Sequence, residues 1–387
     1  MRIAFFNYLR LEQGGGTARF FIDASTGLKK RFPNLEISII TLSENKESAI
    51  NLIYSLYFLK NIKKDLINSN VEIKETLAKF NISYLNIDGY LELKSILSGY
   101  DIIYAKNDFV EAFILKYLVG YQYLNQVIFG FHTPIYYELT PNFQSNIHNL
   151  IYGSFIYIHL IKQAEKFHVL NRFDQNYLKK IFKNKVITKI YNPFDFKKYE
   201  KIKINKVKAI KNKNKLNLLW VGRLTYEKGA DDLINLISEI NLTELAEKVQ
   251  WNIVGGGELE NKVKQLVQKF ANVSYFGFVE NQILTKCFRE NNLFLSTSRW
   301  ESFPYTFLEA QTFGLPIISY DIHGCNEIVK EGDNGYLVKT FEEYKRKLIY
   351  LIQNPKKIIK KKRVKKYIRS LVNTEEIYEK LYKLLID

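Results

Sequence analysis

Short apolar runs alternate with longer helix-like segments along almost the whole chain, and this alternation limits the possible folds more than any other feature. Several runs are continuously apolar, which is typical of strands buried on both faces of a parallel sheet. Alternation of strands with helices predicts right-handed βαβ units and a doubly wound sheet. The expected strands are residues 3–8, 37–41, 82–87, 101–105, 127–131 and 167–170 in the first half, and 216–221, 249–254, 273–276, 293–296, 316–319 and 335–338 in the second.

A Lys- and Asn-rich stretch at residues 197–215 separates the two series of strands. It is typical of a linker between similar domains, although one solvated helix within a single domain is the alternative. About twelve strands exceed one ordinary sheet. We therefore expect an α/β protein with two Rossmann-like doubly wound domains facing each other across a cleft. The predicted parts are residues 1–196, the linker 197–215, residues 216–370 and a C-terminal helical segment at 371–387.

The formal net charge of +17 favours an acidic partner, and nucleic acid, anionic lipid and phosphorylated small molecules all fit it. The basic stretch from Lys356 to Lys366 predicts either attraction to an anionic membrane surface or an ordinary solvated helix. Residues 117–137 and 139–161 are uncharged but are broken by Asn, Gln, Gly and Pro, so they do not predict membrane spans. We expect a cytoplasmic protein, with peripheral attachment at the inner face of the membrane as a further hypothesis.

A glycine loop follows the first expected strand. Gly14, Gly15 and Gly16 precede a helix that we expect to begin near Thr17. Glycines let the backbone approach a ligand closely, and a helix N-terminus offers N–H groups to a phosphate. A simple glycine turn is the competing interpretation, because the loop is not a GxGxxG and no Walker lysine follows.

The loop after the first strand of the second half has the sequence GRLTYEKG at residues 222–229. Its cations, Arg223 and Lys228, could stabilise the charge that develops on a diphosphate leaving group, Arg as a planar fork and Lys as a point charge. Two solvated loop cations are the ordinary alternative, which the strand–loop–helix setting makes less favourable. A glycine trio centred on Gly256 follows the next strand and predicts either a ligand-facing backbone or a plain turn.

The most informative segment is SRWESFPYTFLEA at residues 298–310. Glu301 precedes an expected helix start, and Glu309 lies about two turns further on if the segment is helical throughout. Two Glu residues on a helix usually mark a solvated face, but Glu309 is embedded among apolar neighbours. Carboxylates here can accept hydrogen bonds from sugar hydroxyls, while free N–H groups at the helix start face the same ligand. Those N–H groups would come from Phe303, Tyr305 and Thr306.

His132 directly follows the expected strand at residues 127–131. Ligands bind in open α/β sheets beyond the carboxyl ends of parallel strands, which is where this side chain is expected. A capped core histidine fits the position equally well.

Together these residues resemble the family-four retaining glycosyltransferases with the GT-B fold, the glycosyl transferases group 1. The resemblance is clearest over residues 216–338, where GRLxxEKG, the glycine trio, a Gly-Phe-Val at 277–279 and the ExxxxxxxE segment occur in the family's order. It extends more faintly to the early glycine loop and to residues 132–134 and 191–195. The sequence departs from many members by having Phe303 and Pro304 in place of a glycine-containing stretch.

The resemblance implies individual roles. Arg223 and Lys228 would grip the donor diphosphate, Glu309 would bind the ribose hydroxyls, and Glu301 would contact the transferred sugar. The last helix would cross back to pack on the N-terminal domain. The implied catalytic residues are His132, Arg223, Lys228 and Glu301. The implied donor-binding residues are Gly15, Gly16, Arg223, Lys228, Gly256, Glu301, Phe303, Tyr305, Thr306 and Glu309.

The implied reaction moves a hexose or N-acetylhexosamine from a nucleotide diphosphate sugar to an acceptor, which is a glycan, a glycolipid or a lipid-linked molecule. A UDP-sugar is the expected donor in preference to a GDP-sugar. The implied role is in surface polysaccharide or glycoconjugate synthesis. No carboxylate is placed as a nucleophile, so same-face attack within an ion pair would retain the configuration. We expect no metal, because the chain lacks an Asp-x-Asp motif, the Arg/Lys pair can replace a divalent cation, and Cys287 and Cys325 lie outside any metal-ligand pattern. We also expect the two domains to close on the donor.

Two other functions compete. A non-hydrolysing nucleotide-sugar epimerase shares the double-Rossmann plan, but the GRLxxEKG loop with the paired Glu residues argues against it. A nucleic-acid-binding protein would suit the charge of +17, yet the aromatic residues lie mostly inside expected strands and helices, where core packing explains them. We therefore expect no nucleic-acid partner.

Overall fold

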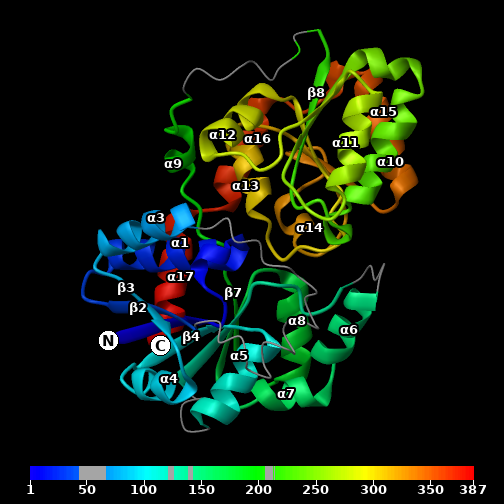
Figure 1. Cartoon of the computed structure of the whole chain (residues 1–387). Coiled ribbons are helices and arrows are strands. Elements are labelled where there is room, and N and C mark those ends of the chain that lie inside the picture. Colours follow the sequence, from blue (N-terminus) through cyan, green and yellow to red (C-terminus); the bar gives the residue numbers. More distant parts are fainter. Residues whose placement is uncertain (43–66, 121–125, 138–142, 205–211, 213) are drawn as a thin grey trace. The chain divides into compact units, whose positions relative to one another are not determined.

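The computed structural model describes residues 1–42, 67–120, 126–137, 143–204, 212 and 214–387. The chain divides into two compact units, and each is described here by itself. The first unit comprises Met1–Pro193 and Thr374–Asp387, and the second comprises Phe194–Asn373. Each unit contains one parallel sheet with helices packed on it (Figure 1).

The first unit is built on a seven-stranded sheet in the order β3-β2-β1-β4-β5-β6-β7, with parallel neighbours throughout. Its strands are β1 (Arg2–Asn7), β2 (Glu36–Leu42), β3 (Ser83–Ile87), β4 (Ile102–Lys106), β5 (Val127–Phe131), β6 (Lys166–Val169) and β7 (Val186–Lys189). Its helices are α1 (Gly15–Arg31), α3 (Ile67–Ala78), α4 (Tyr90–Leu97), α5 (Phe109–Phe113), α6 (Phe143–Tyr152), α7 (Phe155–Ile161), α8 (Arg172–Ile181) and α17 (Thr374–Ile386), with a 3-10 turn η1 (Leu11–Gln13) and a π-helical turn η2 (Ile114–Val119).

The second unit is built on a six-stranded parallel sheet in the order β10-β9-β8-β11-β12-β13. Its strands are β8 (Leu216–Val221), β9 (Val249–Val254), β10 (Val273–Tyr275), β11 (Leu293–Ser296), β12 (Ile317–Tyr320) and β13 (Gly335–Val338). Its helices are α9 (Phe196–Glu200), α10 (Ala230–Asn241), α11 (Glu260–Lys269), α12 (Asn281–Glu290), α13 (Tyr305–Thr312), α14 (Cys325–Ile328), α15 (Phe341–Gln353) and α16 (Lys361–Leu371), with 3-10 turns η4 (Tyr226–Lys228), η5 (Glu244–Lys248) and η6 (Pro355–Lys357).

The predicted fold class is confirmed, and all twelve expected strands are present. The strand β7, which forms one edge of the first sheet, was not predicted from the sequence. This strand has four residues and lies among lysines, and only Ile187 of it is fully buried, while Val186 is 54% exposed. A short edge strand with one buried side chain carries almost no hydrophobic pattern.

Aromatic side chains fill the core of the first unit. Phe5 of β1, Phe20 and Phe21 of α1, and Tyr104 of β4 are all buried. The Phe5 and Phe21 rings lie 5.5 Å apart, and Phe20 lies 5.6 Å from Tyr104. Burying one such side chain contributes roughly 1.5–3 kcal/mol, so this layer between helix and sheet stabilises the first unit.

The last helix, α17, packs against α1 in the first unit. The hydroxyl of Tyr378 donates to the carbonyl of Asp23 at 2.8 Å. A Cβ atom added to Gly27 would lie 2.0 Å from the Tyr378 ring, so α1 has a glycine where α17 crosses it. At the end of α1, the Arg31 guanidinium forms an ion pair with Glu375.

The division between the units differs in detail from the boundaries expected at residues 196 and 370. Helix α9 belongs to the second unit, where it packs on α13, and Phe194 already contacts Tyr199 at 4.7 Å between ring centroids. Of the expected linker, residues 205–211 and 213 lie outside the described residues.

The basic C-terminal stretch is not one continuous helix. The turn η6 ends at Lys357 and α16 begins at Lys361. The apolar side of α16 is used inside the second unit, since Val364 and Ile368 are fully buried. Within the described parts of the chain, no helix combines the length and apolar character needed to cross a bilayer.

Candidate functional site

The loops of the second unit that carry predicted donor residues follow neighbouring strands of the second sheet. β8 lies between β9 and β11, so the strand order reverses there. Ligands of open α/β sheets bind beyond the carboxyl ends of the strands at such a reversal. The turn η4 follows β8, and residues 297–304 connect β11 to α13.

Lys228 and Glu301 make direct contact across this reversal point. The Lys228 Nζ atom donates to Glu301 Oε1 at 2.5 Å, and their side chains are 25% and 13% exposed. A half-buried ion pair keeps both side chains in one geometry while leaving one edge open to a ligand. Both are predicted site residues, but their contact with each other was not predicted from the sequence.

The backbone of Lys228 is anchored to the end of β11. The Thr297 hydroxyl donates to the Lys228 carbonyl at 3.0 Å and accepts the Trp220 indole N–H at 3.1 Å. The next residue, Gly229, has a left-handed backbone with φ of 61°. A Cβ atom there would lie 1.8 Å from the Thr297 carbonyl oxygen, so only glycine allows this close approach.

Arg299 holds the two loops together, a role that the sequence analysis missed. Its guanidinium forms two hydrogen bonds of 2.7 Å with Asp231 at the start of α10 and one of 3.0 Å with Asp232. It also donates to the Tyr226 carbonyl at 2.6 Å. The signal was present in the sequence as the adjacent acids 231 and 232 together with an arginine two residues before Glu301.

Glu309 lies on the second turn of α13 and is only 7% exposed. The segment is not helical throughout, because α13 begins at Tyr305 and Glu301 belongs to the preceding loop. The condition for a separation of two helical turns is therefore not met, whereas Glu301 does precede the helix start as predicted; Pro304, just before α13, has an extended backbone (ψ of 121°). Of the predicted amide donors, Phe303 and Tyr305 have buried side chains, and Thr306 is half-buried.

Arg223 is more open than Lys228, with a side chain 49% exposed and 3.8 Å from Glu227. The glycine trio packs against the same loop, because the Leu224 N–H donates to the Gly256 carbonyl at 2.9 Å. A Cβ atom on Gly255 would lie 1.9 Å from the Gly222 carbonyl oxygen. Packing of one loop on the other thus accounts for the glycine at 255 without a ligand.

In the first unit, the glycine loop forms the start of α1, which begins at Gly15 rather than near Thr17. Gly14 and Gly15 have positive φ angles of 72° and 89°, whereas Gly16 does not. A Cβ atom added to any of the three would meet nothing within 4 Å. The backbone at Gly16 is therefore open without any conformational need for glycine.

His132 lies at the end of β5, where it was predicted, and it is half-buried. Its Nε2 atom lies 3.1 Å from the Tyr104 hydroxyl, which in turn lies 2.5 Å from His168 Nδ1. Burial, helped by His168 and Lys106, holds the pKa of His132 well below its usual value. His168 Nε2 donates to the Ile190 carbonyl at 2.8 Å, so His168 Nδ1 accepts the hydrogen bond that the Tyr104 hydroxyl donates. The oxygen of this hydroxyl then accepts a hydrogen bond from His132 Nε2. This order leaves His132 neutral, with Nδ1 as a hydrogen-bond acceptor.

A second polar group of the first unit follows β4 and was not singled out from the sequence. Lys106 and Asp108 form a buried ion pair at 3.0 Å. Glu111 is fully buried and accepts the Tyr8 N–H at 3.1 Å. Burial is the main cause that raises the pKa of Glu111 to about 7.

No three His, Cys, Asp or Glu side chains lie close enough to hold a metal ion in the described ranges. The two cysteines are buried as free thiols. Burial raises the pKa of Cys287 to about 12, so this thiol is not a nucleophile at neutral pH.

Residues 201–371 match the family model described as glycosyl transferases group 1. An uncharacterized 41.2 kDa protein in the cps region of Klebsiella pneumoniae is 36% identical over 166 residues, which are 42% of this chain and 44% of that protein. An uncharacterized glycosyltransferase of Haemophilus influenzae is 25% identical over 92% of this chain and 91% of its own length. The O-antigen biosynthesis glycosyltransferase WbnH of Escherichia coli is 35% identical over 33% of this chain and 34% of its length. The match thus spans less than half of the first of these relatives.

Among solved structures, that of HepE from Anabaena in complex with UDP-glucose is similar over 100% of this chain and 99% of its own, with a TM-score of 0.70 and 16% identity. This likeness concerns the fold, which is the GT-B fold predicted from the sequence. The match to the glycosyl transferases group 1 family thus covers residues 201–371, which lie within the second unit.

Proposed function

We propose that the protein is a retaining, metal-independent glycosyltransferase that takes a hexose or N-acetylhexosamine from a nucleotide diphosphate sugar. The observation that carries this proposal is the contact between Lys228 and Glu301 at the strand-order reversal of the second sheet. Arg223 lies on the same loop, and α13 begins directly after the loop that carries Glu301.

The ion pair suits a diphosphate leaving group. An ammonium group has three N–H donors, so Lys228 can hold Glu301 and bind a phosphate oxygen together. Arg223, with a half-exposed guanidinium, supplies a planar fork that matches a second phosphate oxygen. Both cations stabilise negative charge as it develops on the departing diphosphate. Such stabilisation by fixed cations is the proposed substitute for a divalent metal.

Glu301 then contacts a hydroxyl of the transferred sugar, and Glu309 on α13 binds the ribose. Glu301 is held by Lys228, which fixes its carboxylate in place rather than leaving it free to attack the anomeric carbon. We therefore assign the acceptor's attack to the same face that the diphosphate leaves, with retention of configuration.

The donor is proposed to be a UDP-sugar. This proposal is supported by HepE of Anabaena, whose solved structure is a complex with UDP-glucose, together with the shared fold. A role in surface polysaccharide or glycoconjugate synthesis is proposed by analogy with WbnH, whose name assigns it to O-antigen biosynthesis.

A lipid-linked acceptor at a membrane surface is supported by exposed apolar side chains on α6 and α7. Phe143, Leu150, Phe155 and Ile156 are 77%, 75%, 80% and 53% exposed. Neither helix contains an Asp or Glu residue. A surface with exposed aromatic rings and no carboxylates suits the interface of an anionic bilayer. Phe155→Ser should weaken sedimentation with phosphatidylglycerol vesicles, whereas Leu91→Ser, which removes an 84% exposed side chain from α4, should not.

Donor use is tested by a thermal-shift screen with UDP, GDP and their sugars, followed by transfer assays with the donor that stabilises the protein. Lys228→Gln should lose most of the UDP-induced shift. Lys345→Gln is the matched control, because Lys345 is 24% exposed and pairs with Glu239 at 2.8 Å in the same unit. Equal shifts in the two variants, or an epimer formed from the donor alone, would refute the proposal.

The first unit is proposed to take part through His132 and the glycine loop. Gly16→Leu is a sharp test, because the folded chain accommodates a side chain there. Unchanged folding with lost transfer would indicate that a ligand approaches this backbone. Full activity of both Gly16→Leu and His132→Gln would remove these residues from the site.

A further inference from the structure

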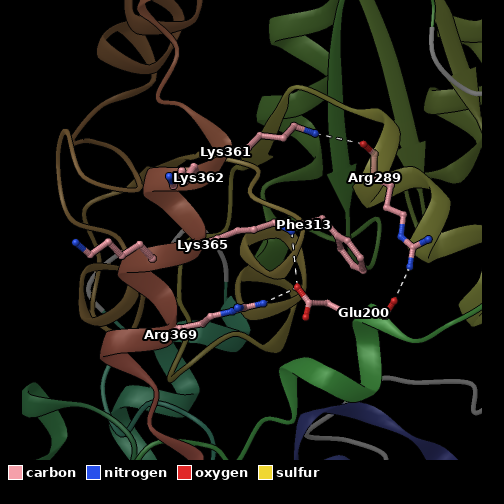
Figure 2. Close-up of a pocket in the computed structure, with 8 residues that line it drawn as sticks. Glu200, Arg289, Phe313, Lys361, Lys362, Lys365 and Arg369 are labelled. Atoms are coloured by element: carbon pink, nitrogen blue, oxygen red, sulfur yellow. Dashed lines mark hydrogen bonds and ion pairs between the residues drawn. The ribbon is translucent and has the colours of Figure 1, made fainter.

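A groove of about 910 Å³ lies beside α16 in the second unit, and none of its lining residues belongs to the proposed donor site. Figure 2 shows that Lys361, Lys362, Lys365 and Arg369 project from α16 along this groove. The remaining lining residues are Glu200, Arg289, Phe313 and Lys366.

Internal contacts hold the walls of the groove in place. Lys361 Nζ donates to the carbonyls of Arg289 and Asn291 at 3.2 and 3.1 Å. The Arg289 guanidinium donates to the Glu200 carbonyl at 2.9 Å and lies 5.3 Å from the centre of the Phe313 ring. The groove is thus a preformed feature in which helices α9, α12 and α16 are joined (Figure 2).

The charge of the groove is far from balanced. The eight lining residues include six cations and one carboxylate, which gives a net charge of +5. Glu200 is shared by Arg369 at 2.5 Å and Lys365 at 3.7 Å. Lys362 and Lys366 form no ion pair with any residue that the structure describes.

The placement of these cations is unfavourable for an isolated helix. Like charges four residues apart destabilise a helix by about 0.2–0.5 kcal/mol per pair, and α16 has such pairs at 361 and 365, 362 and 366, and 365 and 369. Lys361 and Lys362 also occupy its first turn, where the helix dipole disfavours positive charge. A bound anion would relieve both effects.

We propose that this groove is a second binding site, separate from the donor site, for a ligand that carries two or more phosphate groups. Several lysine point charges with two guanidinium groups suit a multivalent phosphate better than a single carboxylate. The phosphates can belong to a soluble molecule or to lipid headgroups, because the chemistry of recognition is the same. The site explains the basic C-terminal stretch as a recognition surface rather than as a solvated helix.

The test measures the binding of two probes: inorganic pyrophosphate by titration calorimetry, and phosphatidylglycerol vesicles in phosphatidylcholine by sedimentation. The variant is Lys362→Gln with Lys366→Gln, and the control removes two exposed lysines from α11, Lys262→Gln with Lys269→Gln. The groove variant should lower affinity by at least about tenfold, and the control should not. Pyrophosphate binding at the donor site is recognised by its loss in Lys228→Gln, which leaves the groove intact.

Glu200→Gln gives a test of opposite sign, because removing the single carboxylate should strengthen binding severalfold. Loss of pyrophosphate binding in the groove variant assigns a soluble ligand, and loss of vesicle binding alone assigns headgroups. The proposal is overturned if neither probe binds, if the groove variant binds like the control, or if Glu200→Gln leaves affinity unchanged.

Discussion

Replacing Gly229 by alanine should damage the proposed donor site without removing any polar group. Gly229 has φ of 61°, and a non-glycine residue there costs about 1–2 kcal/mol. Alanine also lowers the conformational entropy of the unfolded chain, which stabilises the folded state by about 0.4–1 kcal/mol. The added Cβ atom would start 1.8 Å from the Thr297 carbonyl oxygen and must move by about 1.2 Å to reach the 3.0 Å minimum. Overpacking of this kind costs a further 1–3 kcal/mol or so.

Gly332→Ala is the matched control. Gly332 also has a positive φ, 77°, but a Cβ atom there would meet nothing within 4 Å. We therefore expect a loss of about 1 kcal/mol for Gly332→Ala and about 2–4 kcal/mol for Gly229→Ala. Only Gly229→Ala should also lose UDP binding, because Lys228 moves with its neighbour.

Urea unfolding followed by tryptophan fluorescence measures this difference selectively. All three tryptophans, at 220, 251 and 300, lie in the second unit, so the signal reports on the unit that carries the mutation. Equal destabilisation of the two variants, or full UDP binding by Gly229→Ala, would refute the inferred role of the close contact.

Three further predictions address charge, protonation and metal. Glu301→Gln removes the anion beside Lys228, so UDP should bind severalfold more tightly. Sugar transfer should nevertheless fall by about 10²-fold or more. Looser UDP binding would contradict this reasoning. Since burial raises the pKa of Glu111 to about 7 from 4.5, the folded state keeps a proton that the unfolded state releases. The contribution of Glu111 to stability should therefore fall by up to about 3 kcal/mol between pH 4.5 and 7. Glu111→Gln should be more stable than wild type at pH 8 but not at pH 4, as urea unfolding would show, and a pH-independent difference would contradict this. Sugar transfer should persist after EDTA treatment, and a loss restored by Mg²⁺ would contradict the assignment to Arg223 and Lys228.

The sequence was sufficient for the fold because buried parallel strands leave a strong pattern. Strands such as β9, with all six residues buried, could be recognised from composition alone. The edge strand β7 could not be recognised in this way, because it is formed by hydrogen bonding to β6 and not by hydrophobic burial. The start of α1 was misplaced by two residues because glycines carry no helix signal, although Gly15 is already helical.

The contacts within the candidate site could not be predicted from the sequence. Motif spacing identified Lys228 and Glu301, yet their ion pair depends on a strand order that places β8 beside β11. The role of Arg299 was missed for the same reason, since its partner Asp231 lies 68 residues away in the chain. The α16 groove likewise brings Glu200 and Arg289 to a helix that is distant in sequence.

A crystal structure of the protein with UDP tests the central claim most directly. We expect a β-phosphate oxygen at a hydrogen-bonding distance of about 2.7–3.2 Å from Lys228 Nζ, with the ribose beside Glu309. UDP bound elsewhere on the chain, with Lys228 still contacting only Glu301, would contradict it.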